Sequence, residues 1–331
     1  MRTPSKLTIA LITSGFAVAL GACKKPPEPA PEASAAPSNS PSAVPSAPKL
    51  VEKPAAATPD PKRYAWLGDG GRVMPKATAT LAGSIPTPPG YTRVKVEPGS
   101  FAAWLRDLPV AAQNTPVLDY RGNEVYPGND DYVQSVVAID VGKKDLQQST
   151  DVILRLQAEW LWAQGRRDLT YKSATKDMLP FASYSEGKRV LAQAGHLYWV
   201  KKTDPNESND RAAFRDYLDV VFIWVNSTAI RMQSNEVDAK DVQAGDFFMQ
   251  RSKGGYSVVV LDIAEKPTGQ RVALLGQGLY PATNIYVARP GRATPWFSLR
   301  PPDPILTAHT KELKWSDLRR LEVPSADASG K

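Results

Sequence analysis

The chain of 331 residues carries a formal net charge of +7 and is long enough for one large or two ordinary domains. No basic stripe or stacking aromatic motif accompanies that charge, so the sequence predicts no nucleic-acid partner. Its single cysteine excludes an intrachain disulfide and a Cys-rich metal site, and we expect no cofactor.

The first 22 residues have the pattern of an export signal. Arg2 and Lys6 precede an apolar run from Leu7 to Leu20, which ends in the sequence Leu-Gly-Ala-Cys at Cys23. This ending resembles a bacterial lipoprotein signal, in which the cysteine thiol takes a diacylglyceryl group before cleavage. We therefore expect residues 1–22 to be removed and Cys23 to anchor the protein through acyl chains such as palmitate. The alternatives are a transmembrane anchor and an ordinary secretory leader, but the run is short for a hydrocarbon core of about 30 Å.

Residues 23–62 are rich in Pro, Ala and Ser. Such a segment cannot bury enough apolar surface to offset the entropy of an ordered chain, so we expect a disordered tether. A proline-rich binding motif is the alternative. We expect the folded part to be a single domain at residues 63–323, followed by a loose tail at residues 324–331.

The domain is predicted to begin with a short helix and three strands. Residues 100–108 place their apolar side chains on one helical face, with Ser100 as the N-cap and Pro109 as the stop. Residues 117–126 are predicted to form a small hairpin, and residues 133–141 a further strand.

The longest predicted helix spans Asp145 to Gln164. Its apolar residues recur at steps of three and four, and Gly165 stands where a C-terminal cap belongs. Ser149 is expected near the N-terminal end of the buried face. Asp145 and Asp151 could form a site, but carboxylates are favoured at helix starts in any case, so capping is their expected role.

The middle of the chain gives fewer signals. A strand is predicted at residues 169–172, whereas residues 180–206 have no assignable pattern. A helix is predicted from Ser208 or Asn209 to Val225, and residues 227–232 are a candidate for the next.

The last predicted elements are strands. The segment from Ala244 to Ala264 is expected to form a buried hairpin, because two apolar runs follow a Gly-Asp and a Gly-Gly turn. Further strands are predicted at residues 271–276 and 285–288, with Gln277 at the exit of the first. Helices followed by a run of strands predict an α+β domain with an antiparallel sheet.

Seven segments of the folded part are GSFAAWLRDLP at 99–109, DLQQSTDVILRLQAEWL at 145–161, FRDYLDVVF at 214–222, AGDFFMQ at 244–250, GYSVVVLDIA at 255–264, LLGQGLYPA at 274–282 and TPWF at 294–297. Together they resemble a bacterial family, domain of unknown function 4846. In that family the second segment usually has Cys where this chain has Ser149, and the fifth has His where this chain has Tyr256. Those two positions resemble in turn the NlpC/P60 branch of papain-like cysteine hydrolases. The resemblance implies a papain-like domain, with helices packed on an antiparallel sheet and Gln277 as the third polar residue of the site.

The resemblance also implies a catalytic chemistry from which this chain departs. In such hydrolases a thiolate at a helix start is the nucleophile, a neighbouring imidazolium lowers its pKa, and a third side chain orients the imidazole. Ser149 instead offers a hydroxyl that needs a general base, and the phenol of Tyr256 is a poor base at neutral pH. We therefore expect Ser149, Tyr256 and Gln277 to be an inactive version of that site.

The two histidines of the chain, His196 and His309, match neither motif position. A lone histidine is more often a surface or structural residue than a catalytic one. Either histidine within hydrogen-bond reach of Ser149 would restore the possibility of catalysis.

Two functions remain open at this point. The first is a lipid-anchored protein of the cell envelope whose non-catalytic, hydrolase-like domain binds a peptide or a glycan, in peptidoglycan or on another envelope protein. The second is an active hydrolase of cell-wall or acyl substrates that uses Ser149 with an unidentified base. A purely structural lipoprotein is not separated from the first by any sequence feature. Lys24, rather than an aspartate, follows Cys23, which by resemblance to Gram-negative lipoprotein sorting favours the outer membrane.

Overall fold

The computed structural model describes residues 57–69, 73–201, 208, 210–250, 256–308 and 312–324. Cys23, the expected signal peptide, most of the expected tether and His309 lie outside these residues. Within them, no helix has the length and the apolar character that crossing a membrane requires.

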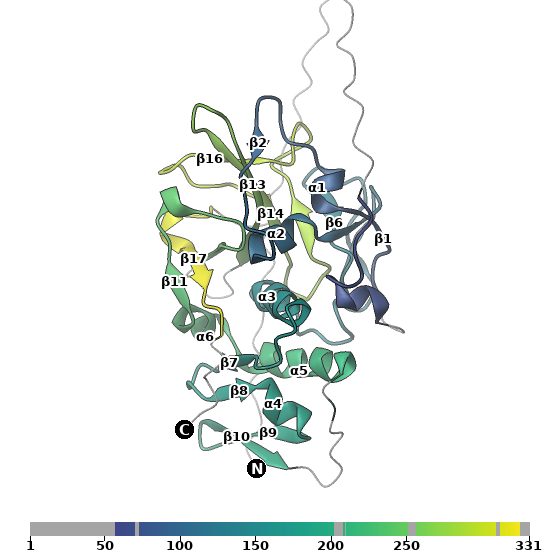
Figure 1. Cartoon of the computed structure of the whole chain (residues 1–331), viewed down its shortest axis with the longest axis vertical. Coiled ribbons are helices and arrows are strands. Elements are labelled where there is room, and N and C mark those ends of the chain that lie inside the picture. Colours follow the sequence, from purple (N-terminus) through teal and green to yellow (C-terminus); the bar gives the residue numbers. More distant parts are fainter. Residues whose placement is uncertain are drawn as a thin grey trace, which may run out of the picture. The chain divides into compact units, whose positions relative to one another are not determined.

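The fold is mixed α and β, and its largest sheet is antiparallel. The strands of this sheet are β2 (Thr92–Arg93), β6 (Val133–Val136), β11 (Ser234–Glu236), β12 (Phe247–Met249), β13 (Ser257–Glu265), β14 (Arg271–Gln277), β15 (Tyr286–Ala288), β16 (Phe297–Leu299) and β17 (Leu318–Leu321). Seven of these nine strands follow the order β11-β17-β12-β13-β14-β15-β6, while β16 pairs with β14 and β2 with β13 (Figure 1). All of these pairings are antiparallel, as the sequence predicted.

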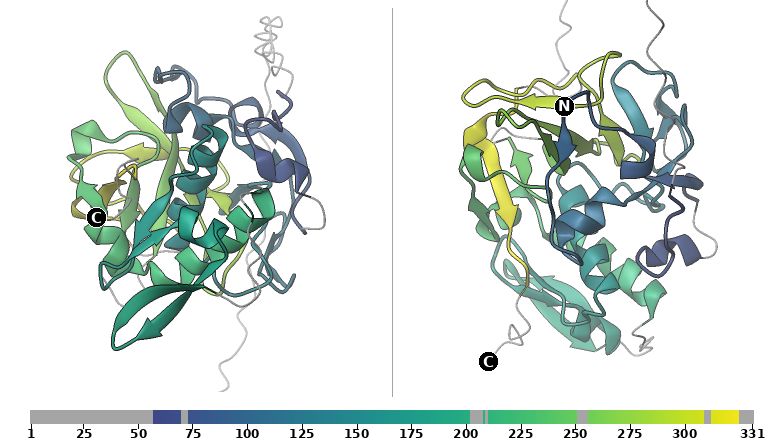
Figure 2. Two further views of the ribbon diagram at one scale, coloured as in Figure 1. Left: turned by 60° about the horizontal axis from the view of Figure 1, so that its bottom comes forward. Right: turned by 45° about the horizontal axis from the view of Figure 1, so that its top comes forward.

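The other strands of the described part form two-stranded sheets. Their pairs are β1 (Ala77–Thr80) with β3 (Pro109–Ala111), β4 (Val117–Leu118) with β5 (Glu124–Tyr126), β7 (Thr170–Lys172) with β8 (Met178–Pro180), and β9 (Lys188–Gln193) with β10 (His196–Lys201). Figure 2 shows from two further directions that the β9–β10 hairpin extends away from the nine-stranded sheet.

The helices of the described part lie mainly on one side of the sheet. They are α1 (Leu81–Ser84), α2 (Phe101–Arg106), α3 (Asp151–Ala163), α4 (Phe181–Ser185), α5 (Arg211–Trp224) and α6 (Ser227–Met232), with short 3-10 turns at Ala65–Gly68, Ala239–Asp241 and Trp315–Asp317. In Figure 1, α3 lies between α2 and α5, and α4 lies beyond α5.

Strand β13 is the element around which the interior forms. Its Val259 and Leu261 belong to the core cluster that also contains the apolar residues of α3, whereas Val258 and Val260 belong to a second cluster. Successive side chains of a strand point to opposite faces, so β13 is buried on both. A β-branched run suits this position because such residues pack well on a pleated surface. The hairpin predicted from Ala244 is confirmed, because β12 and β13 pair directly.

The ends of α2 and α3 agree with the predicted caps. The Ser100 hydroxyl accepts a hydrogen bond from the Ala103 N–H, and β3 begins at Pro109. At the end of α3, Gly165 has a φ of 76°, its N–H donates to the Trp162 carbonyl, and the Arg166 N–H donates to the Leu161 carbonyl. These two bonds form a Schellman cap, which requires a left-handed residue at Gly165.

The start of α3 differs from the prediction. The helix begins at Asp151, and residues 145–150 form turns instead, in which the Gln148 N–H bonds the Leu146 carbonyl. A tertiary contact accounts for the later helix start, because the Asp145 carboxylate accepts a hydrogen bond from the N–H of Ala282, far along the chain, at 2.7 Å. Ser149 therefore stands before the helix and not within its buried face.

Two other segments differ from the prediction. The strand expected at 133–141 is regular only over β6, because the Ala138 N–H turns away to bond the Pro109 carbonyl. The segment 180–206, which had no assignable pattern, contains α4, β9 and β10. The hairpin strands have mostly exposed or half-exposed side chains, so they lack the clear apolar alternation that marks a buried strand.

Candidate functional site

Ser149 is held against the first residue of β13. Its Oγ accepts a hydrogen bond from the Ser257 N–H at 2.9 Å and donates one to the Ser257 carbonyl at 3.3 Å. The pairing of β14 with β13 stops at Gln277 and Val258, one residue further along. Where β14 ends, the hydroxyl of Ser149 thus forms the hydrogen bonds to Ser257 that a further residue of β14 would otherwise form. Both serines are buried, so these bonds satisfy backbone groups that water does not reach.

Tyr256 directly precedes β13. Its carbonyl accepts a hydrogen bond from the Gln250 N–H at 3.2 Å, and its half-buried ring packs on the second core cluster. Tyr126 and Tyr286 lie in the same region, with ring centroids 5.9 Å apart. Burial raises the pKa of Tyr126, and Asp130 and Tyr256 add to that effect. Tyr256 is therefore part of a group of aromatic side chains.

Gln277, the last residue of β14, is fully buried. It lies opposite Val258 on one side and Tyr286 on the other. Neither its Oε1 nor its Nε2 has a hydrogen-bond partner among the described residues. Leaving a buried amide unsatisfied costs on the order of 1–3 kcal/mol, so stability alone does not favour a glutamine at this position.

The three positions thus meet at the N-terminal end of β13, but their side chains do not share one direction. Strand alternation places the side chain of Gln277 with that of Val258, on the face of the second core where Tyr256 also packs. Ser149 approaches from the α3 side, and within the described part its hydroxyl bonds only Ser257.

The described histidine lies elsewhere. His196 is on β10, is 58% exposed, and its Nδ1 is 3.2 Å from Asp177 Oδ1.

The two carboxylates that the sequence analysis proposed as helix caps, Asp145 and Asp151, have different environments. Asp145 bonds Ala282, as described above, whereas Asp151 is buried and accepts one hydrogen bond, from the Gln148 N–H. Burial raises the pKa of Asp151 well above its usual value.

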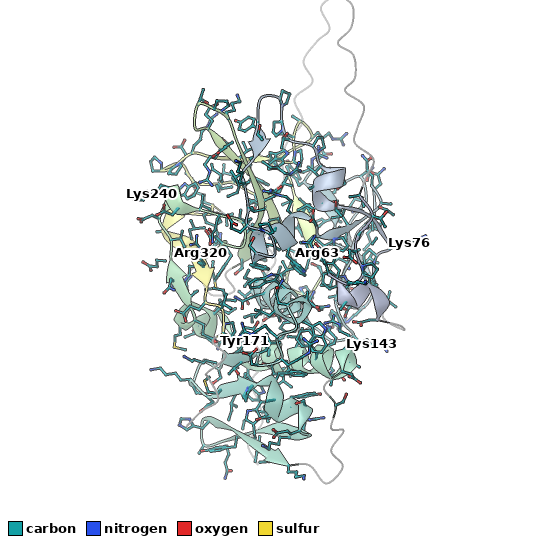
Figure 3. All side chains as sticks on the ribbon, in the orientation of Figure 1. Arg63, Lys76, Lys143, Tyr171, Lys240 and Arg320 are labelled. Carbon is teal, nitrogen blue, oxygen red and sulfur yellow. The ribbon has the colours of Figure 1, made fainter. Side chains whose placement is uncertain are left out.

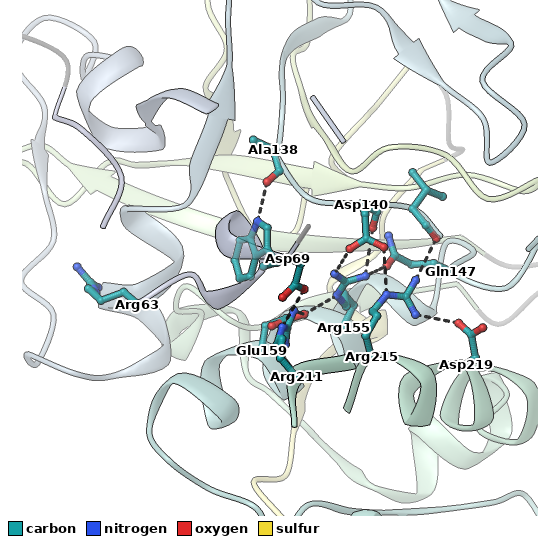
Figure 4. Close-up of polar contacts among 12 residues, drawn as sticks. Arg63, Asp69, Ala138, Asp140, Gln147, Arg155, Glu159, Arg211, Arg215 and Asp219 are labelled. Atoms are coloured by element: carbon teal, nitrogen blue, oxygen red, sulfur yellow. Dashed lines mark hydrogen bonds and ion pairs between the residues drawn. The ribbon is translucent and has the colours of Figure 1, made fainter. Parts of the chain in front are cut away.

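An ionic network between α3 and α5 was not anticipated from the sequence (Figure 4). Arg155 pairs with Asp140 at 2.7 Å and with Glu159 at 2.9 Å, and Arg215 pairs with the same Asp140 at 3.1 Å. Arg211 on α5 reaches Glu159 at 2.6 Å. Burial by itself would lower the pKa of Arg155, but Asp140 and Glu159 raise it. The sequence signal for this network was the spacing of Arg155 and Glu159, four residues apart within a largely apolar helix.

A metal centre finds no support in the described ranges, where no group of three or more His, Cys, Asp and Glu side chains is placed to hold an ion.

The sequence pattern of the family described as domain of unknown function 4846 matches residues 81–320. The chain belongs to this family. No curated protein and no solved structure matches it.

Two acidic residues in the segments that resemble this family have structural partners. Asp262 of β13 accepts hydrogen bonds from Arg93 at 2.6 Å and from Arg106 at 2.9 Å. Asp246, which follows the turn at Gly245, pairs with Arg320 at 2.6 Å and also accepts the Gln243 N–H. These carboxylates tie β13 and the turn before β12 to distant segments. Their place in the motifs is therefore explained by folding.

Proposed function

We propose that this protein is a lipid-anchored component of the bacterial cell envelope whose domain has the arrangement of a papain-like hydrolase but binds a peptide or glycan without cleaving it. The likeness to that fold is supported by the order of the elements at three positions, although the side chains of Ser149 and Tyr256 lie on different faces of the sheet. Ser149 precedes a helix packed on the sheet, Tyr256 precedes β13, and Gln277 ends the neighbouring β14. In papain-like hydrolases the nucleophile, the base and the orienting residue stand at such positions.

The observation that carries the proposal is the pair of hydrogen bonds between Ser149 and Ser257. A hydroxyl has one proton, and that of Ser149 is donated to the Ser257 carbonyl. A general base would have to draw this proton away and leave a buried backbone carbonyl unpaired. Tyr256, the residue at the position of the base, packs with the aromatic group on the other face of the sheet. The hydroxyl therefore acts as a fixed backbone partner.

Absence of hydrolysis is tested with the full chain, purified from membranes in a neutral detergent. It is incubated with peptidoglycan fragments and with a serine-directed fluorophosphonate probe, and we expect neither cleavage nor labelling of Ser149. Ser257→Ala is the matched control, because it removes a buried hydroxyl beside Ser149 that has no partner in the described part. Turnover that Ser149→Ala abolishes, in a sample that is still folded, would instead support an active hydrolase.

The lipid anchor is tested separately, since Cys23 lies outside the described residues. We expect metabolic labelling with a palmitate analogue in the wild type, and loss of the label and of membrane association in Cys23→Ala. A Cys23→Ala protein that stays equally firmly in the membrane fraction, together with an unlabelled wild type, would contradict the anchor.

A further inference from the structure

We infer that a pocket beside the β4–β5 hairpin binds a small organic carboxylate with an apolar body. The pocket has a volume of about 330 Å³, at the lower end of the usual range for small-molecule sites. Neither Ser149 nor Tyr256 nor Gln277 lines it, so the inference does not rest on the proposed function.

The walls of the pocket come from segments far apart in the sequence. Pro116 and Leu118 line it at β4, and Val141 lines it from the segment before α3. Val73 also lines the pocket and is 91% exposed. An apolar lining of this kind favours a ligand whose body is itself apolar.

Two cations line the pocket, and both are exposed. Lys143 forms no ion pair within the described part. Arg121 lies over the ring of Tyr120, 5.0 Å from its centroid, and adds its charge to the hydrogen bonds from Asn123 that lower the pKa of Asp119. Figure 3 labels Lys143, on the right of the view. The two acids of the lining are already committed. Asp140 is paired with Arg155 and Arg215, and Asp119 accepts hydrogen bonds from the backbone of its own turn at Arg121 and Asn123. The pocket therefore favours an anion over a cation.

Asn284 gives an independent indication of a ligand. The residue is only 4% exposed and lines the pocket, and its Oδ1 accepts the Leu118 N–H at 2.9 Å. Its Nδ2 group donates to no atom of the described residues. This donor is presented to the pocket without a protein acceptor, so a ligand acceptor can take the place of water there. A carboxylate supplies that acceptor together with the negative charge for Lys143.

The experiment compares three ligands of one shape on the full chain in a neutral detergent: 4-phenylbutyrate, its amide 4-phenylbutanamide, and the cation 4-phenylbutylamine. Dissociation constants come from ligand-observed NMR titrations. We expect the carboxylate to bind at least about tenfold more tightly than the amide, because hydrogen bonds to charged groups are the stronger ones, and the amine not to bind. The neutral amide enters neutral micelles more readily than the carboxylate, so the detergent cannot produce this preference.

Charge reversals test the assignment to this pocket. Lys143→Glu and Arg121→Glu are each expected to weaken carboxylate binding about tenfold or more, and both positions are exposed, so the variants should fold. Lys240→Glu is the matched control, an exposed lysine that Figure 3 shows on the other side of the view. Asn284→Asp keeps the acceptor for the Leu118 N–H but replaces the donor by a carboxylate, and should abolish binding. Equal binding of carboxylate and amide, or equal effects of Lys143→Glu and Lys240→Glu, would overturn the inference.

Discussion

Arg155 and Asp140 face each other across the interior of the domain, 2.7 Å apart and both almost fully shielded from water. Each is in turn bonded to a further charge, Arg155 to Glu159 and Asp140 to Arg215. The pair is thus the centre of a network in which the loss of one member leaves others uncompensated.

We expect Arg155→Met to lower the free energy of unfolding by about 3–5 kcal/mol, because it leaves Asp140 and Glu159 buried without their shared cation. Arg63→Met is the matched control, since Arg63 pairs with Asp107 at the same distance of 2.7 Å but with side chains 39% and 40% exposed. Its cost should be below about 1 kcal/mol. Denaturant unfolding followed by tryptophan fluorescence measures both, and similar losses would show that burial of the network is unimportant.

Ser149→Ala removes the partner of two buried backbone groups of Ser257. The expected loss is about 1–3 kcal/mol, the usual cost of leaving a buried polar group unsatisfied. Ser257→Ala, next to it in space, removes a hydroxyl without a hydrogen-bond partner in the described part and should change stability by less than about 0.5 kcal/mol. Equal stability of the two variants would mean that the Ser149 bonds contribute nothing.

Asp151→Asn should stabilise the protein at high pH. Since burial raises the folded-state pKa of Asp151, the native state binds its proton more tightly than the unfolded state does. Wild-type stability therefore falls as the pH rises from the unfolded value, about 3.9, through the raised pKa. The asparagine does not ionise and keeps an acceptor for the Gln148 N–H.

At pH 8 we expect Asp151→Asn to melt at least about 2 °C higher than the wild type, with the gap closing as the pH approaches about 4. Asp303→Asn, at an exposed carboxylate, controls for the loss of one formal charge. A lower melting temperature of Asp151→Asn at pH 8 would mean that the helix N-terminus stabilises the ionised carboxylate more than burial destabilises it.

Gly245→Ala should be destabilising for two reasons. Gly245 has a φ of 99°, and an added Cβ would lie 2.8 Å from Cδ1 of Phe101. The backbone term alone is about 1–2 kcal/mol for an L-residue. Gly68→Ala is the control of opposite sign, because no atom lies within 4 Å of its added Cβ and its φ is not in the left-handed region. A gain of up to about 1 kcal/mol is expected there, measured by thermal unfolding.

The parts of the fold that the sequence predicts well are those decided locally. The Ser100 cap, the Gly165 cap and the bounds of α6 depend on residues a few positions apart, and the β-branched run of β13 marks a strand wherever it lies. The start of α3 is different, because Asp145 and Ser149 are held by Ala282 and Ser257, residues more than a hundred positions away. No window of local sequence contains those partners.

For the candidate site, the sequence predicted which elements carry its residues but not the hydrogen bonds that those residues form. The motif order indicated that Ser149, Tyr256 and Gln277 belong to neighbouring elements, but nothing in the sequence shows that the Ser149 hydroxyl is used by the Ser257 backbone. The ionic network escaped prediction for a similar reason, since Asp140 and Arg215 are 75 residues apart. Charges that compensate one another across such distances can be recognised only when both are seen in place.

The position of β17 fixes the order in which one edge of the sheet can form. This strand, Leu318–Leu321, lies between β11 and β12 and pairs with both. β12 also pairs with β13, so most of the sheet keeps its pairings without β17. β11 reaches the sheet only through β17. Although β11 precedes β12 in the chain, it can therefore join the sheet only after the later strand β17 is in place.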